Sequence, residues 1–193
     1  MGVMRLIGEI DPTRPLLVLA VAEEAAHLTS GLPVLLTGMG KVNAATAVAT
    51  VLARGPRPTA VVNLGTAGAL KPGFAGVTHE VSSVIQHDLD SAMLASLTGV
   101  TYGGPIGLTG RGPVLATGDL FVADEAARAR LAEEADLVDM EGYAVAQAVR
   151  QTGLPVRLVK HVSDDAGEGA AKSWRESVDD CAKELARWAA ENL

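Results

Sequence analysis

Residues 60–68 read AVVNLGTAG, a short apolar run that leads into two glycines three positions apart. A run of Val and Leu without polar alternation is typical of a β-strand that is buried on both faces. We therefore predict a strand at Ala60–Leu64. Runs of the same kind predict five more strands, at Leu16–Ala22 (LLVLAVA), Pro33–Thr37 (PVLLT), Val81–Ile85 (VSSVI), Val114–Thr117 (VLAT) and Val156–Val162 (VRLVKHV).

Helical patterns alternate with these strands. Asp124 is a favourable N-cap, and Gly153 followed by Pro155 is a common way to end a helix. The alternation of strands and helices predicts an α/β layered fold with a parallel or mixed sheet. The helices are expected at Asn43–Ala53, Asp124–Glu134, Glu141–Gln151 and Ala170–Asn192.

The last predicted helix carries an apolar stripe. Trp174, Val178, Cys181, Leu185 and Trp188 recur every three or four residues, which is the spacing of one helix face. We expect this face to pack on the sheet. The sole cysteine, Cys181, is then a core residue rather than a nucleophile.

Composition limits the class of protein. A chain of 193 residues with 48% hydrophobic and 20% charged residues suits one globular domain. The net charge of −7 argues against binding to nucleic acid or to an anionic membrane. No apolar run reaches the ~18 residues of a membrane span, and Met1–Pro15 lacks the apolar core of a signal peptide. We expect a soluble, cytoplasmic protein without disulfides.

Ligands in α/β folds collect beyond the carboxyl ends of the strands, so the residues that follow each strand are candidates for a site. Taken singly, each candidate has a simple structural explanation as a helix-dipole acid, an N-cap or a turn glycine. Several carboxylates at one sheet edge are costly to bury without a ligand or a proton to transfer. The candidates are Glu23 and Glu24, Gly65–Gly68, Val138–Glu141 and Ser163–Asp165.

Two other motifs are weak. Gly38-Met39-Gly40 begins like a dinucleotide fingerprint, but Asn43 replaces the third glycine and Asn63 stands where an acid is needed. His87, Asp88 and Asp90 lack the paired histidines or cysteines of a metal site. We therefore predict no cofactor and no metal.

Taken in order along the chain, these segments resemble the nucleoside phosphorylase and nucleosidase superfamily, and most closely the 5′-methylthioadenosine/S-adenosylhomocysteine nucleosidases. The resemblance implies a three-layer αβα fold with a mixed, twisted central sheet flanked by helices. The resemblance touches nearly the whole chain from Leu16 to the end, and we expect a single nucleosidase-like domain, residues 1–193, with residues 1–15 as an N-terminal extension. The matching stretches are VLAVAEEAAHL (18–28), LLTGMGKVNAA (35–45), AVVNLGTAGAL (60–70), IQHDLD (85–90), ATGDLFVAD (116–124), LVDMEGYAVAQAV (137–149) and LVKHVSDDA (158–166).

The resemblance also implies catalytic roles. Asp164 looks like the acid that protonates N7 of a leaving purine. Glu24 looks like the base that activates water, helped by Thr66, while Lys160 stands where the family usually has arginine. Two carboxyls suit this chemistry because one neutralises the leaving base while the other prepares water, each for ~10²–10⁴-fold in rate. We expect burial or the neighbouring Asp165 to raise the pKa of Asp164.

Substrate-binding roles follow from the same resemblance. Phe121 would stack on the base, and the backbone of Val122 would bind its edge. Met140 and Glu141 would hold the ribose, and Ser163 belongs to the matching Ser-Asp pair. The expected partner is a small purine nucleoside, in a pathway such as methionine salvage.

Phosphorolysis remains the main alternative to hydrolysis. Phosphorylases of this superfamily commonly carry an arginine where this chain has Asn63, and an amide cannot neutralise a phosphate dianion. Water is therefore the favoured nucleophile. Lys41, Lys71, Arg111 and Lys160 remain as candidate cations for phosphate.

Residues 90–114 depart from the family pattern, because they are short and rich in glycine. Relatives usually have a further helix here, with residues that reach the site of a neighbouring subunit. The difference leaves the 5′ substituent open and admits a futalosine-type substrate. A non-catalytic nucleoside-binding protein is a further alternative, although binding alone needs no proton donor. Homodimers are usual in the family, and we expect one here.

Overall fold

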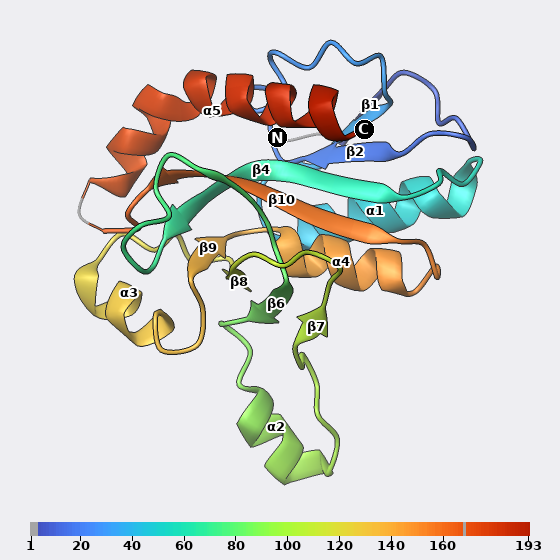
Figure 1. The fold of residues 1–193 in the computed structure, drawn as a ribbon. Helices are drawn as coiled ribbons and strands as arrows, with labels where there is room; N and C mark the ends of the chain where they lie inside the picture. The colour runs from blue at the N-terminus through green and yellow to red at the C-terminus, as the bar shows by residue number, and fades with distance from the viewer. Residues whose placement is uncertain (1–3, 168) are drawn as a thin grey trace.

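The computed structural model describes residues 4–167 and 169–193, which form one ten-stranded mixed sheet with helices on both faces (Figure 1). Its strands run in the order β1-β3-β2-β4-β9-β8-β6-β7, while β10 pairs with both β4 and β5. The strands are β1 (Arg5–Ile7), β2 (Leu16–Leu19), β3 (Val34–Leu36), β4 (Val61–Ala69), β5 (Thr78–Glu80), β6 (Ser83–Gln86), β7 (Ile106–Gly107), β8 (Val114–Thr117), β9 (Leu137–Asp139) and β10 (Val156–Asp164).

Strand β4 organises the sheet. It pairs in parallel with β2 and along its length with β10, and its last residues pair with β9 in the antiparallel sense. The strand runs on to Ala69, so Gly65–Gly68 lie inside it. The prediction that the strand ends at Leu64 is therefore wrong. Because β2, β4 and β10 are parallel, their carboxyl ends meet at one edge.

Three layers result, as the sequence predicts. Helix α5 packs on β10 and β4 on one face of the sheet, while α1 and α4 pack together on the other, with α4 against β10 and β8 (Figure 1). The αβα fold with a mixed central sheet is confirmed. The helices are α1 (Lys41–Arg54), α2 (Ser91–Thr98), α3 (Glu125–Leu131), α4 (Gly142–Arg150) and α5 (Ala170–Asn192).

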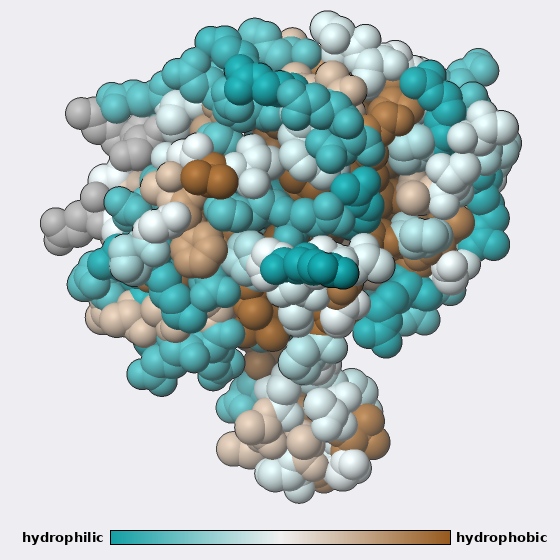
Figure 2. All heavy atoms as spheres, in the orientation of Figure 1, coloured by the Kyte–Doolittle hydropathy of each residue, from teal (hydrophilic) through white to brown (hydrophobic). Residues whose placement is uncertain are grey.

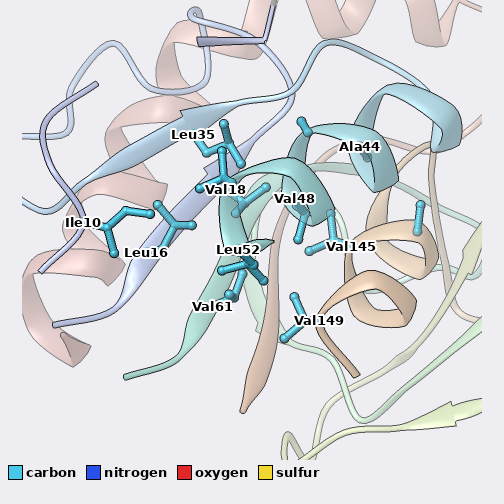
Figure 3. Close-up of a cluster of buried hydrophobic side chains, with 13 residues drawn as sticks. Ile10, Leu16, Val18, Leu35, Ala44, Val48, Leu52, Val61, Val145 and Val149 are labelled. Carbon is cyan, nitrogen blue, oxygen red and sulfur yellow. The ribbon is translucent and has the colours of Figure 1, made fainter. Parts of the chain in front are cut away.

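Alternate residues of the strands pack into hydrophobic clusters on opposite faces of the sheet. Leu16 and Val18 of β2 join Val48 of α1 and Val145 of α4 in one buried cluster, which Figure 3 shows between the strands and the two helices. Leu17 and Leu19 point the other way and pack with Leu185 of α5. Both faces of β2 are thus fully buried, which explains its run of consecutive apolar residues.

Several short elements are additional to the prediction. β1 and β7 are edge strands, β5 pairs with β10, β9 lies between β4 and β8, and α2 lies in the glycine-rich segment. Of the N-terminal extension expected at residues 1–15, residues 1–3 lie outside the described residues, and β1 joins the sheet beside β3. Within residues 4–167 and 169–193, no helix has both the length and the apolar composition needed to cross a membrane.

Candidate active site

A cavity of about 690 Å³, counted out to its open mouth, lies at the carboxyl ends of β2, β4, β9 and β10. Apart from Lys160, every residue to which the resemblance assigns a catalytic or binding role contributes to its wall, whereas the further candidates Glu23, Gly65 and Asp165 do not. Strand pairing accounts for the convergence, since Gly68 of β4 is in register with Asp164 of the parallel strand β10 and with Val138 of the antiparallel strand β9. The predicted residues that line the cavity are Glu24, Thr66, Phe121, Val122, Met140, Glu141, Ser163 and Asp164.

Glu24 is buried, with 4% of its surface exposed, and belongs to a turn that follows β2. Its Oε1 accepts hydrogen bonds from the backbone N–H and the hydroxyl of Thr66, both at 2.8 Å. Its Oε2 is buried and has no hydrogen-bond partner within the described part of the chain. Glu23 is exposed, so Glu24 is the member of the pair that faces the cavity. No helix follows β2 directly, so the helix-dipole explanation for the pair does not apply.

Lys160 lies beneath the cavity floor and is fully buried. Its Nζ is 2.9 Å from Asp139 Oδ2 in an ion pair that is almost completely inaccessible to solvent. Burial alone would lower the pKa of Lys160, but Asp139 and Glu141 outweigh it, so the pKa is raised. A Cβ atom on Gly65 would lie only 3.2 Å from Lys160 Nζ. Lys160 is therefore an internal counter-ion for the carboxylates around it.

Glu141 immediately precedes α4, yet its side chain does not cap the helix. Its Oε1 accepts instead from the backbone N–H of Gly40 at 2.7 Å, which links two segments 101 residues apart. Burial, reinforced by Asp139 and opposed by Lys160, raises the pKa of Glu141 to about 8. The free site therefore favours a neutral Glu141 at neutral pH.

This pKa predicts how Glu141 affects stability. The unfolded chain ionises Glu141 near its ordinary value of 4.5, whereas the folded protein keeps the proton up to about pH 8. The folded state binds more protons in this window, so the contribution of Glu141 to stability falls as pH rises from about 5 to 8. Glu141→Gln removes the titration. We expect the variant's Tm, relative to wild type, to increase over this range.

Thermal melts of Glu141→Gln, wild type and Glu133→Gln at pH 5, 6.5 and 8 test this prediction. Glu133 is exposed and serves as the matched control. A Tm difference for Glu141→Gln that stays constant with pH, or that falls, would contradict the raised pKa.

Asp164 ends β10 and is hydrogen-bonded on both oxygens. Ser163 Oγ donates to Oδ2 and the Ala166 N–H donates to Oδ1, each at 2.8 Å. Burial raises the pKa of Asp164 despite these hydrogen bonds, and the charge of Asp165 raises it further. A Cβ atom on Gly68 would lie 3.2 Å from Asp164 Oδ1, so glycine allows the carboxyl to sit against β4. A raised pKa is the property that a carboxylic acid needs to donate a proton.

The mouth of the cavity is apolar and partly open. Phe121 is 49% exposed and Leu120 is 71% exposed, and Met39 and Trp174 complete this part of the wall. Met39 is an addition to the predicted site, and the spacing of the last helix predicts Trp174 on the stripe that packs on the sheet. Cys181 and Leu185 of that stripe are buried as expected, but the Trp174 ring faces the cavity.

Three of the four cations proposed for phosphate, Lys41, Lys71 and Lys160, have other partners. Lys41 bonds to Asp88 and Gln86, and Lys71 pairs with Asp136 at 2.7 Å. Among the described residues, neither a lysine nor an arginine lines the cavity. Asn63 is buried in the sheet, where its amide donates to the carbonyl of Val18 at 2.9 Å.

The glycine segment Gly38–Gly40 contributes a backbone donor to Glu141 rather than a cradle for a dinucleotide. Across residues 4–167 and 169–193, no three His, Cys, Asp or Glu side chains gather in a way that could hold a metal ion.

Fold and cavity together define an α/β protein whose strand ends enclose a pocket with buried carboxyls on its wall. The chain belongs to the phosphorylase superfamily, whose family model matches residues 27–104 and 108–192.

Similar proteins include enzymes with two different substrates. Over 71 residues the chain is 39% identical to an aminodeoxyfutalosine nucleosidase of Campylobacter jejuni, with 36% of this chain and 31% of that enzyme covered. Over 55 residues it is 44% identical to a 5′-methylthioadenosine/S-adenosylhomocysteine nucleosidase of Treponema pallidum, covering 28% of this chain and 20% of that enzyme. Both matches thus span less than a third of the relative.

The structural similarity covers more of the chain than the sequence matches do. A solved 5′-methylthioadenosine/S-adenosylhomocysteine nucleosidase of Helicobacter pylori superposes with a TM-score of 0.82 at 21% identity. The match covers 93% of this chain and 97% of that one, so nearly the whole architecture is shared.

Proposed function

We propose that this protein hydrolyses the N-glycosidic bond of a purine nucleoside of the methylthioadenosine/S-adenosylhomocysteine type, releasing free base and sugar. The observation that carries the proposal is the pair of carboxyls on the wall of one cavity, the buried Glu24 and the partly buried Asp164. Thr66 binds Glu24, and Gly68 packs against Asp164. These two β4 residues are two positions apart and share a face, which separates their contacts by roughly 7 Å along the strand.

In the proposed mechanism Asp164 donates its proton to N7 of the purine as the bond from the sugar C1′ to N9 breaks. The electron pair of that bond leaves with the base, and the sugar acquires oxocarbenium character. Glu24 accepts a proton from water, whose oxygen forms the new bond to C1′. Each proton transfer contributes about 10²–10⁴-fold, and the buried carboxylates stabilise the developing positive charge.

The remaining cavity residues would orient the substrate. Glu141 would accept hydrogen bonds from the ribose hydroxyls beside Met140, and these bonds favour its charged form. Phe121 would stack on the purine, with Val122 at the base edge. The apolar mouth at Met39 and Leu120 suits a thioether substituent at the 5′ position.

Water is preferred over phosphate as the nucleophile. Phosphate beside the ribose needs a cation that is free to bind it. Lys160 is buried and paired with Asp139, and the Asn63 amide is engaged within the sheet. An aminodeoxyfutalosine-type nucleoside is the second candidate substrate, because the chain is 39% identical over 71 residues to the Campylobacter enzyme that is named for it.

Release of free base in phosphate-free buffer tests the proposal. We expect adenine from methylthioadenosine, at a rate that added phosphate does not increase. Aminodeoxyfutalosine and adenosine are assayed in parallel, and faster release from aminodeoxyfutalosine reassigns the substrate. A strict phosphate requirement indicates a phosphorylase. Binding of the nucleosides without release indicates a non-catalytic binding protein.

We also propose a homodimer formed through the arm, defined as residues 87–105, which projects from the body in Figure 1. No residue of α2 is buried, and Leu97 is 72% exposed and Met93 54% exposed. Figure 2 shows apolar side chains on this lobe, as expected of a contact surface. A monomeric wild type in sedimentation velocity, indistinguishable from Leu97→Glu, would argue against the dimer.

The proposed reaction implies a role in methionine salvage, and we propose a cytoplasmic location. Cells that lack the protein are then expected to accumulate methylthioadenosine. Unchanged methylthioadenosine in such cells would count against this role.

A further inference from the structure

The Trp174 side chain makes a polar contact with the catalytic side of the cavity. Trp174 lies one turn into α5 and its ring lines the cavity. The indole Nε1 lies 2.9 Å from Thr66 Oγ1, across 108 residues of sequence. This hydrogen bond joins the C-terminal helix to the β4 residue that holds Glu24.

The donor and acceptor properties of Trp174, Thr66 and Glu24 fix which group donates each hydrogen bond. An indole N–H can only donate a hydrogen bond, whereas a hydroxyl has one proton and two acceptor lone pairs. Thr66 Oγ1 therefore accepts from Trp174 and keeps its own proton for Glu24 Oε1, at 2.8 Å. The hydrogen bonds run from Trp174 through Thr66 to Glu24 and cannot reverse.

The direction matters for Glu24. Its Oε1 receives two hydrogen bonds from Thr66, one from the backbone and one from the hydroxyl. Its Oε2 is buried without a hydrogen-bond partner among the described residues. Two donors on one oxygen fix the plane of the carboxylate. Linked hydrogen bonds also polarise one another, so the indole strengthens the bond from the hydroxyl to Glu24.

We propose that Trp174 is a positioning residue that directs the Thr66 hydroxyl at Glu24 and thereby presents Oε2 as the oxygen that takes the proton. The inference rests on the proposed function, because it needs Glu24 as the base. The indole then serves two purposes, since its ring forms the cavity wall and its N–H sets the geometry of the base.

Trp174→Phe separates these purposes, because it keeps an aromatic ring and removes the donor. We expect kcat to fall about 3- to 10-fold, the effect of one net hydrogen bond, with KM within about twofold of wild type. Trp188→Phe is the matched control, since Trp188 stacks beneath the Arg157 guanidinium at 4.8 Å and does not line the cavity.

A double-mutant cycle with Thr66→Val tests the route. If the indole acts through the hydroxyl, Trp174→Phe causes no further loss of kcat in the Thr66→Val background. Additive losses in the cycle would overturn the inference. A Trp174→Phe variant that raises KM and leaves kcat unchanged would overturn it as well, because the ring would then act only as a wall.

A readout independent of turnover is the ¹⁵N–¹H resonance of the indole. Thr66→Val should move the resonance that Trp174→Phe abolishes and leave that of Trp188 in place, and an unmoved Trp174 resonance overturns the contact. Failures of the two proposals are distinguishable. A wild type that releases no base from any nucleoside overturns the proposed function. An active wild type whose kcat is matched by that of Trp174→Phe overturns only the positioning role.

Discussion

Asp164→Asn is expected to lower kcat for base release by about 10²–10⁴-fold while methylthioadenosine still binds. The amide has nearly the shape of the carboxyl and retains an acceptor for the Ala166 N–H, so the cavity wall is preserved. It has no acidic proton to give to the purine. Turnover measured beside ligand affinity, by calorimetry for example, separates the two effects.

Asp165→Asn is the matched control for this variant, because Asp165 is exposed and lies next in the chain. Asp164 acts while protonated, so its activity is present below its pKa and is lost as pH rises through it. The charge of Asp165 helps to raise that pKa. Asp165→Asn should therefore retain turnover at its optimum, with the alkaline limb moved to lower pH. If Asp164→Asn retained wild-type turnover, the acid would have to lie elsewhere.

The layered fold could be predicted from the sequence because burial on both faces leaves a direct signal. Strands such as β2 read as unbroken Val and Leu, and the last helix begins and ends at the residues expected for it, Ala170–Asn192. β1, β5, β7 and β9 are two or three residues long. Such short strands exist only through pairing with distant residues, so their own sequence carries little information about them.

The structural reason for the two glycines of β4 cannot be read from the sequence. Gly65 and Gly68 resemble turn residues, yet neither has a positive φ and both lie within the strand. A Cβ atom would lie 3.2 Å from Lys160 Nζ at Gly65, and at Gly68 it would lie 3.2 Å from Asp164 Oδ1 and clash with Ala166 Cβ at 2.9 Å, so these glycines answer to residues nearly 100 positions later. Helix α2 is different, since Asp90 as N-cap and the left-handed Gly99 at its C-terminus were readable signals of a helix.

The acidic residues of the site could be located from their positions after strands, but their protonation states and charged partners could not be predicted. The sequence identifies Lys160 only as a replacement for arginine, whereas its buried partner Asp139 depends on how β9 and β10 are placed. Trp174 fitted the apolar stripe of α5 by spacing alone. Its hydrogen bond to Thr66 results from the packing of the helix over β4, which spacing does not encode.

Glu24→Gln is expected to lower kcat by about 10²–10⁴-fold, because an amide can accept the Thr66 hydrogen bonds but cannot take a proton from water. Glu23→Gln is the matched control, an identical change at the exposed neighbour, and should leave kcat within about twofold of wild type. Equal losses in the two variants would contradict the assignment of the base. Steady-state rates with methylthioadenosine in phosphate-free buffer are the measurement.

Chemical rescue by azide distinguishes loss of the catalytic base from loss of the catalytic acid. Azide is an anion that attacks without deprotonation, so Glu24→Ala, which also leaves room beside Thr66, should regain base release when azide is added. The product is then the glycosyl azide, because nitrogen replaces the water oxygen at C1′. Asp164→Asn should gain nothing from azide, since its leaving base still lacks a proton. Rescue of both variants, or of neither, would mean that the two carboxyls do not divide the work between nucleophile and leaving group.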